Sequence, residues 1–340
     1  VQSGAGALTG FDDAEYLDAG ADIVPEAETI FETCDMIIKV KEPQPQEYDM
    51  FQEGQILYTY LHLAANRELT EFLLSRKVSG VAYETIETEK KQLPCLKPMS
   101  EIAGRLSVQE GAKYLEKPFG GRGILLGGVP GVDRGKVVIV GGGVVGRNAC
   151  KIAVGFGAEV TVLDIDVERL EYLDDIYGGS ITTLYSNRAN ILKEVKDADL
   201  IIGAVLIHGA PTPKLIKRED LSLMKKGAVV VDVAVDQGGC IETAKPTTHD
   251  DPIYVIEDVV HYCVANMPGA VAFSSTRALV STTLPYGLTI ANKGLEKACK
   301  ENAAVMKGLN TYRGKCTYPD VAETFSLEYH NAEKLLTEQS

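Results

Sequence analysis

The chain has 340 residues, of which 45% are hydrophobic and 24% are charged, and its 34 Lys+Arg and 48 Asp+Glu give a formal net charge of −14. This length is sufficient for two domains with separate cores. The acidic balance argues against sequence-independent binding to nucleic acid or an anionic membrane surface, because both require basic patches. No apolar run approaches the roughly 20 residues that cross a bilayer, and the chain does not open with a signal-peptide pattern. We therefore expect a soluble, acidic, globular protein.

The first part of the chain alternates strand and helix patterns. Short apolar runs predict strands at 35–41, 55–60 and 78–84, and an amphipathic stretch predicts a helix at 67–77. Such alternation indicates a parallel sheet covered by helices. A glycine-containing turn arrives within the first six residues. We therefore expect that the chain opens after the first strand of its domain, either because the start was removed or because this is a fragment.

A second block of the same kind begins near Pro94. Ser100 is expected to cap a helix that runs to about Leu115, and glycine-rich loops follow at 120–123 and 127–131. Strands are then predicted at 136–140, 159–163, 181–185, 200–206, 228–235 and 253–257. The run 229–231 is apolar on both faces, which is typical of a sheet buried on both sides. From Thr276 onward the pattern is helical.

The seven cysteines are scattered, and no two have the CxxC spacing of a zinc ligand pair. In a chain of this length the pattern is typical of reduced thiols that fill small apolar spaces in a cytoplasmic protein. We therefore predict a cytoplasmic location, no metal site and no catalytic cysteine. The seven residues are Cys34, Cys95, Cys150, Cys240, Cys263, Cys299 and Cys316.

The strongest motif is a glycine-rich turn, Gly141-x-Gly143-x-x-Gly146, between a predicted strand and a predicted helix. The next strand ends in Asp164, 18 residues after Gly146, close to the roughly 20 residues expected for a ribose-binding carboxylate. The glycines would let the backbone approach a pyrophosphate, and the helix N-terminus would attract its charge. Asp164 favours NAD over NADP, although the nearby Arg169 could contact a 2′-phosphate. A glycine-rich turn without a ligand is the less favoured alternative.

Three further side chains follow predicted strands and could take part in chemistry. His62 could act as a general acid or base near neutral pH, although a lone histidine is more often structural. Lys41 could bind a carboxylate or carbonyl, or it could be an ordinary solvated lysine paired with Glu42. Asp236 follows the strand predicted at 228–235, where ligands of parallel sheets bind, and could equally cap a turn.

Six motifs in chain order resemble those of the alanine dehydrogenase family, which includes the related transhydrogenase alpha subunits. They are Lys39-Val40-Lys41-Glu42-Pro43, Leu61-His62-Leu63-Ala64-Ala65, Pro98-Met99-Ser100-Glu101-Ile102-Ala103-Gly104-Arg105, Gly127-Gly128-Val129-Pro130-Gly131, Asp236-Gln237-Gly238-Gly239-Cys240 and Ala265-Asn266-Met267-Pro268-Gly269. The resemblance covers essentially the whole chain. It implies an α/β fold with two Rossmann-like, doubly wound parallel-sheet domains flanking a cleft. Residues 1–94 with 270–340 would form a discontinuous substrate domain, and 95–269 an NAD-binding domain.

The resemblance also implies an activity and a set of site residues. L-alanine, NAD and water would be converted reversibly to pyruvate, ammonium and NADH by a homo-hexamer with no nucleic-acid or membrane partner. His62 and Asp236 would be catalytic, and Lys41 and Met99 would bind substrate. The cofactor would contact Ser100, Gly141, Gly143, Val144, Val145, Gly146, Asp164, Arg169, Ser186, Val205, Leu206, Val233, Ala234, Val235, Val264, Ala265, Asn266 and Met267.

One departure from the family concerns the start of the chain. The family opens with a strand followed by a Lys-Glu pair and an arginine that binds the substrate carboxylate, and we expect this chain to begin after that segment. Two alternative functions therefore stay open: an NAD-binding subunit that resembles a transhydrogenase, and a non-catalytic NAD-binding protein. The presence of Lys41, His62 and Asp236 together favours the dehydrogenase, because transfer between two nucleotides involves no substrate proton.

Overall fold

The computed structural model describes residues 1–206 and 212–337, which divide into two compact units. One unit comprises Val1–Pro98 and Ala272–Ser340, and the other comprises Met99–Val271. Both are α/β units whose mixed sheets are built around parallel strands, so the predicted fold class is confirmed. The functions predicted for the two parts of the chain stay predictions.

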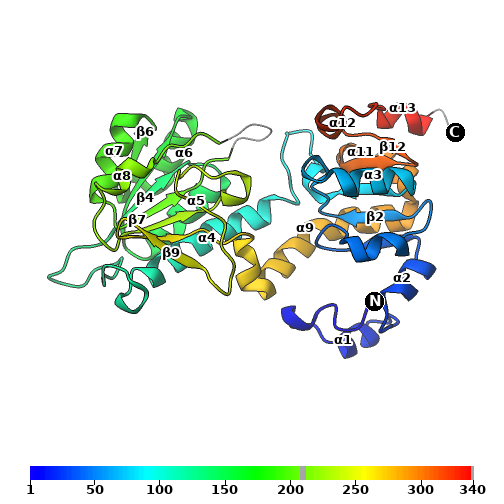
Figure 1. Ribbon diagram of the computed structural model, residues 1–340, viewed down its shortest axis with the longest axis horizontal. Helices are drawn as coiled ribbons and strands as arrows, with labels where there is room; N and C mark the ends of the chain where they lie inside the picture. The colour runs from blue at the N-terminus through cyan, green and yellow to red at the C-terminus, as the bar shows by residue number, and fades with distance from the viewer. Residues whose placement is uncertain (207–211, 338–340) are drawn as a thin grey trace. The chain divides into compact units, whose positions relative to one another are not determined.

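The first unit contains a five-stranded sheet in the order β1-β2-β3-β11-β12 (Figure 1). The strands β1 (Met36–Ile38), β2 (Ile56–Thr59) and β3 (Ser79–Ala82) are parallel. The strands β11 (Leu309–Tyr312) and β12 (Lys315–Cys316) extend the sheet in antiparallel fashion. The pattern predicted as helical from Thr276 onward is therefore interrupted by a hairpin. The helices of this unit are α1 (Asp13–Asp18), α2 (Ala27–Thr33), α3 (Arg67–Ser75), α9 (Ala272–Lys293), α10 (Leu295–Glu301), α11 (Ala303–Gly308), α12 (Pro319–Phe325) and α13 (Ala332–Thr337).

The α3 helix shows how the sequence determines one of these elements. Asn66 precedes the helix and its side-chain oxygen accepts the Leu69 N–H at 3.0 Å, which satisfies a donor that has no partner within the helix. Leu69 and Leu73 are one helical turn apart and fully buried with Leu57 of β2. The predicted amphipathic helix at 67–77 is therefore present and ends two residues earlier than expected.

The second unit contains a seven-stranded sheet in the order β6-β5-β4-β7-β8-β10-β9. Six strands are parallel and only β9, at one edge, pairs in antiparallel fashion. The strands are β4 (Lys136–Val140), β5 (Glu159–Asp164), β6 (Ile181–Tyr185), β7 (Leu200–Gly203), β8 (Val229–Asp232), β9 (Ile253–Ile256) and β10 (Val259–Tyr262). The helices are α4 (Lys97–Tyr114), α5 (Val144–Gly155), α6 (Val167–Tyr177), α7 (Arg188–Asp197) and α8 (Arg218–Leu221).

Alternate residues of the central strands pack on opposite faces of this sheet. Val137 and Ile139 belong to one core, whereas Val138 and Val140 belong to a second core on the other face. The apolar run of β8 divides between the same two cores. Both faces of the sheet are therefore covered, which explains why its strands are continuous apolar runs.

The α4 helix begins earlier than the sequence indicated. We expected Ser100 as its N-cap, but the helix starts at Lys97 and Ser100 lies in its first turn. Pro98 is compatible with this start because the first N–H groups of a helix have no partner within it. Further along, a Cβ at Gly104 would lie 2.2 Å from the Val145 carbonyl oxygen, so this glycine allows α4 to pack directly on α5.

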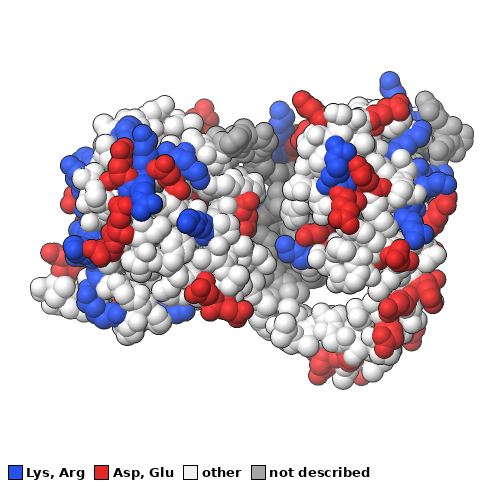
Figure 2. Space-filling view, in the orientation of Figure 1, with Lys and Arg blue, Asp and Glu red and all other residues white. Residues whose placement is uncertain are grey.

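The surface is mixed in charge. On the face shown in Figure 2, basic and acidic side chains are intermixed over much of each unit, whereas the N-terminal segment, which has no Lys or Arg in residues 1–35, shows acidic side chains alone. Within residues 1–206 and 212–337, no helix is both long and apolar enough to cross a membrane.

Candidate cofactor site and catalytic side chains

The glycine-rich turn after β4 has the geometry that its spacing predicted. Gly141 has a left-handed backbone (φ 105°), and a Cβ there would lie 2.6 Å from the Ala204 carbonyl oxygen. A Cβ at Gly146 would lie only 1.7 Å from the Gly141 carbonyl oxygen. Gly141 therefore allows a close approach of the residue that follows β7, and Gly146 allows the start of α5 to pack against the end of β4.

The N-terminus of α5 is open to a ligand. Gly143 is its N-cap and offers no side chain to the first helical N–H groups, those of Val144 and Val145 among them. A Cβ at Gly143 would meet nothing within 4 Å. A helix N-terminus of this kind supplies backbone donors and positive potential to an anionic group such as a pyrophosphate.

Asp164 connects the glycine-rich turn to the end of β5. Its carboxylate accepts the Gly142 N–H at 2.5 Å and the Asp166 N–H at 2.9 Å, and the residue is 5% exposed. The Arg169 guanidinium lies 3.6 Å from Asp164 and 3.1 Å from Asp166. Arg169 is therefore paired with two carboxylates, and Asp164 holds the turn that would receive the cofactor.

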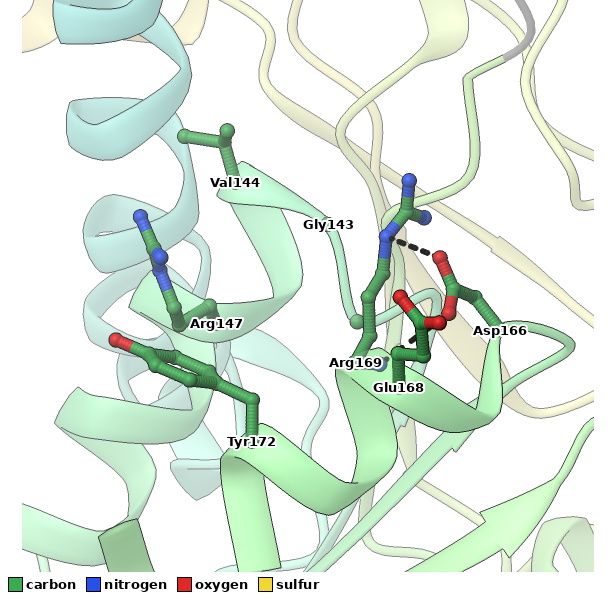
Figure 3. A pocket seen from close by; sticks show the side chains of 8 residues that line it. Gly143, Val144, Arg147, Asp166, Glu168, Arg169 and Tyr172 are labelled. Atoms are coloured by element: carbon green, nitrogen blue, oxygen red, sulfur yellow. Dashed lines mark hydrogen bonds and ion pairs between the residues drawn. The ribbon is translucent and has the colours of Figure 1, made fainter. Parts of the chain in front are cut away.

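A pocket of about 340 Å³ opens beside these residues (Figure 3). The N-terminus of α5 contributes Gly143 and Arg147, and the start of α6 contributes Arg169 and Tyr172. The Arg147 guanidinium lies over the Tyr172 ring, 5.8 Å from its centre. The pocket thus combines backbone donors, an aromatic surface and two arginines next to Asp164.

The loop after β8 brings Asp236 to a predicted cofactor segment. The Asp236 carboxylate accepts the Asn266 N–H at 3.2 Å. The loop is held at both ends by the fully buried Asp232, which accepts the Ala234 N–H at 3.2 Å and the Ile241 N–H at 2.9 Å. Burial raises the pKa of the Asp232 carboxyl, although these backbone donors oppose the shift.

The other predicted cofactor residues of this unit follow the ends of parallel strands. Ser186 comes directly after β6, and its N–H is bonded to the Asp164 carbonyl oxygen at 2.9 Å. Val205 follows β7, and its side chain would lie 3.0 Å from a Cβ at Gly141. The segments that contain Val233–Val235 and Val264–Met267 follow β8 and β10. Met99 and Ser100 follow no strand and lie in the first turn of α4, a helix whose Gly104 packs on Val145 at the start of α5.

Lys41 and His62 lie in the other unit, at the carboxyl edge of its parallel strands. Lys41 follows β1, and its carbonyl oxygen accepts the Thr59 hydroxyl at 3.1 Å. His62 follows β2 with a left-handed backbone (φ 49°), and its side chain is 51% exposed. The structure therefore brings Lys41 and His62 to one sheet edge and groups Asp236 with the cofactor residues at another.

Three carboxylates that the sequence analysis did not single out support these residues. Glu84 accepts the His62 N–H at 2.6 Å, Glu42 lies 3.5 Å from the His62 ring, and Asp232 holds the loop of Asp236. Glu84 follows β3, so the rule that parallel strands end at one edge could have found it. The same rule applies to Glu42, which follows β1, and to Asp232, the last residue of β8, although the partner that each one takes depends on how the loops fold.

The last two predictions concern the cysteines and a possible metal site. All seven thiols are free, six of them are buried, and burial raises the pKa of Cys95 and of Cys150 to about 12, which keeps them protonated at neutral pH. Among the residues that the structure describes, no three His, Cys, Asp or Glu side chains are placed to hold a metal ion.

Comparison with family models gives two adjacent matches. The model of the "Alanine dehydrogenase/PNT, N-terminal domain" matches residues 1–103, and that of the "Alanine dehydrogenase/PNT, C-terminal domain" matches residues 107–319. The first match includes residue 1 of this chain.

Individual proteins agree with these matches. The chain is 57% identical to an alanine dehydrogenase of Methanococcus maripaludis, over 99% of this chain and 91% of that protein. It is 53% identical to alanine dehydrogenase 2 of Staphylococcus aureus (strain USA300), over 99% and 90% of the two chains.

Solved structures give the same result. An L-alanine dehydrogenase structure superposes with a TM-score of 0.93 at 53% identity, over 96% of this chain and 90% of that one. A transhydrogenase from Sinorhizobium meliloti, at 24% identity and a TM-score of 0.79 over 94% and 89% of the chains, shares the fold. On the strength of the two domain matches and the identity along almost its whole length, this chain belongs to the alanine dehydrogenase/PNT family.

Proposed function

We propose that the chain is an L-alanine dehydrogenase, which converts L-alanine, NAD and water reversibly to pyruvate, ammonium, NADH and a proton. The observation that carries the proposal is the 57% identity over 99% of the chain to a protein of that name. The likeness to a transhydrogenase, at 24% identity, concerns the fold alone.

The residues after β4 and β5 fit an NAD molecule. The open N-terminus of α5 would bind its pyrophosphate, and the space at Gly143 would let the backbone approach that group. Asp164 would bind the ribose hydroxyls. When bound, NAD supplies the acceptor for a hydride from the substrate carbon. The remaining predicted contacts, from Ser186 to Met267, follow neighbouring strand ends and would extend the same site.

We propose NAD rather than NADP as the cofactor. A 2′-phosphate would meet the negative charge of Asp164, which lies 5% exposed beside the turn. Arg169, the residue that could offset this repulsion, is already paired with Asp164 and Asp166. The pairing makes it a weaker phosphate ligand than its position in the sequence indicated.

Three side chains would handle the substrate. Lys41 would hold its carboxylate or carbonyl group through charge, and Met99 would line the pocket. His62 would exchange a proton with the substrate oxygen, since imidazole gains and loses protons near neutral pH. The negative charge of Asp236 would stabilise positive charge on the substrate nitrogen during ammonia addition and release. A hydroxy-acid dehydrogenase has no such nitrogen to stabilise.

A steady-state assay tests the proposal. The protein is incubated with L-alanine and either NAD or NADP, and NADH formation is followed by absorbance; pyruvate with ammonium and NADH is measured in the reverse direction. We expect turnover in both directions with alanine and NAD. NAD binding without turnover would instead favour a non-catalytic NAD-binding protein, and reduction of a second nucleotide by NADH would favour a transhydrogenase-like subunit.

We also propose that the chain forms a cytoplasmic homo-hexamer with no nucleic-acid or membrane partner. Light scattering coupled to size exclusion measures the mass of the assembly, and any mass other than six times 36.7 kDa contradicts the proposed number.

A further inference from the structure

The Glu42 carboxylate has one oxygen that is buried but not hydrogen-bonded. Glu42 follows β1 and its side chain is 24% exposed, yet Oε2 has no hydrogen-bond partner among the described residues. A buried acceptor without a donor costs free energy, so such atoms in folded proteins usually serve a purpose. The atom that faces Oε2 is Nδ1 of His62, at 3.5 Å.

The other side of His62 is fixed by neighbouring elements. Glu84, from the turn after β3, accepts the N–H of Leu61 at 3.1 Å and that of His62 at 2.6 Å. These bonds hold His62 in a left-handed conformation that residues with a side chain rarely adopt. The Tyr60 ring lies 5.8 Å from the imidazole with an angle of 18° between the planes. The backbone and the ring plane of His62 are thus both constrained.

We propose that Glu42 is a positioning residue for His62 in the reaction described above, on which this inference rests. In the working enzyme Glu42 would accept a hydrogen bond from Nδ1–H, which would keep the proton on Nδ1 and so fix the neutral imidazole in the tautomer whose Nε2 is unprotonated. Nε2 then takes the proton from the hydroxyl of the carbinolamine that forms when water adds to the oxidised substrate: an N–H bond forms and the O–H bond breaks. The electron pair left on oxygen forms the carbonyl of pyruvate as the C–N bond of the protonated amine breaks and ammonia leaves. The Glu42 charge also stabilises the imidazolium until its proton passes to solvent.

Three ionisable groups near His62 could influence the pH dependence of its proton transfer. Glu42 lies at the ring, and Glu84 meets the backbone N–H rather than the ring. Tyr60 stays neutral, because burial raises its pKa and its hydroxyl donates to the Cys95 carbonyl oxygen at 2.7 Å. Among these three groups, Glu42 is therefore the one whose charge acts directly on the imidazole.

The test compares Glu42→Gln with wild type and with a matched control. Glu71→Gln removes one negative charge from the same unit, at a residue of α3 that forms its ion pair with Arg67 of the same helix. We measure kcat, KM for alanine, the Kd of NAD and the pH dependence of kcat/KM for alanine oxidation. A second variant, Glu42→Asp, keeps the charge but shortens the side chain.

Glu42→Gln is expected to lower kcat about 10- to 100-fold and to leave the Kd of NAD unchanged. If Glu42 acts on the imidazole, the acid limb of its pH profile moves to lower pH, because the carboxylate no longer favours the protonated imidazole. Glu42→Asp retains the wild-type acid limb at a reduced kcat, and Glu71→Gln behaves as wild type.

The outcomes of these measurements distinguish a failure of this inference from a failure of the proposed function. If wild type oxidises alanine and Glu42→Gln loses kcat without any shift of the acid limb, Glu42 is merely structural and the inference is overturned. The same conclusion holds if Glu42→Gln keeps full activity, or if Glu42→Asp shifts the limb as Glu42→Gln does. If wild type itself shows no alanine oxidation, the proposed function fails first.

Discussion

Replacing Gly146 by alanine tests the proposed cofactor site at its most crowded point. A Cβ at this position would lie 1.7 Å from the Gly141 carbonyl oxygen, whereas ordinary contact begins at 3.4 Å. Both partners are backbone, so no side-chain rotation relieves the overlap. The start of α5 and the end of β4 must separate by a large fraction of the missing 1.7 Å.

The cost of Gly146→Ala follows from that displacement. Overpacking of this kind typically costs about 1–3 kcal/mol of stability, and the better helix propensity of alanine returns at most about 1 kcal/mol. Moving a group that positions a ligand by about 1 Å can lower the reaction rate by up to about 100-fold. We expect at least a tenfold weaker NAD affinity, or about 1.4 kcal/mol.

The assay measures NAD binding by calorimetry and unfolding by urea. Gly155→Ala is the matched control, because it lies at the other end of α5 and its Cβ would meet nothing within 4 Å. That variant should bind NAD normally and be as stable as wild type or slightly more stable. Wild-type NAD affinity in Gly146→Ala would refute the assignment of the glycine-rich turn to the cofactor.

Three other variants test separate parts of the structure. Asp164→Ala should weaken NAD binding about 10- to 100-fold, because it removes the ribose acceptor and the bond to the turn, and should reduce the preference for NAD over NADP; an unchanged cofactor preference contradicts the ribose contact. His62→Ala should lower kcat by about 10²- to 10⁴-fold with the NAD Kd unchanged, and a large loss of NAD binding contradicts its assigned role. Lys136→Met should destabilise the fold by about 3 kcal/mol in urea at pH 7, since it leaves the buried Glu194 without the ammonium 2.8 Å away. Burial alone would raise the pKa of Glu194, but its bond to Lys136 lowers that pKa overall. The pair therefore stabilises the fold above pH 4.5. The difference in unfolding free energy between variant and wild type should become smaller as the pH falls below that value.

The central strands and the glycine-rich turn could be predicted from local patterns. The central parallel strands β4, β7 and β8 are short apolar runs, and their two-sided burial follows from the period of the strand. The spacing of Gly141, Gly143 and Gly146 reflects contacts within about ten residues of chain. Such contacts leave a signal in the sequence because the partners are neighbours.

The missed elements depend on partners far away in the sequence. The β11 strand is Leu309-Asn310-Thr311-Tyr312, whose polar residues are buried, and it pairs with β3 more than 220 residues earlier. The buried Thr311 hydroxyl donates to the Val78 carbonyl oxygen at 2.9 Å, so a polar residue takes a core position. The β10 strand contains His261, whose ring nitrogens are satisfied by Thr243 and by its own strand. Neither strand shows the apolar run by which strands are recognised.

The candidate site residues of the second unit follow from one property of parallel sheets. All six parallel strands end at one edge, and each end leads into a predicted cofactor or catalytic segment: Ser186, Asp164, Gly141, Val205, Val233–Asp236 and Val264–Met267, in the order of the sheet. The antiparallel β9 strand carries none of them. The first unit repeats the arrangement, since Lys41, His62 and Glu84 follow β1, β2 and β3, while β11 and β12 carry no predicted site residue. Parallel strands place their carboxyl ends side by side whatever the length of the connecting chain, so residues far apart in sequence become neighbours without a specific interaction to bring each pair together.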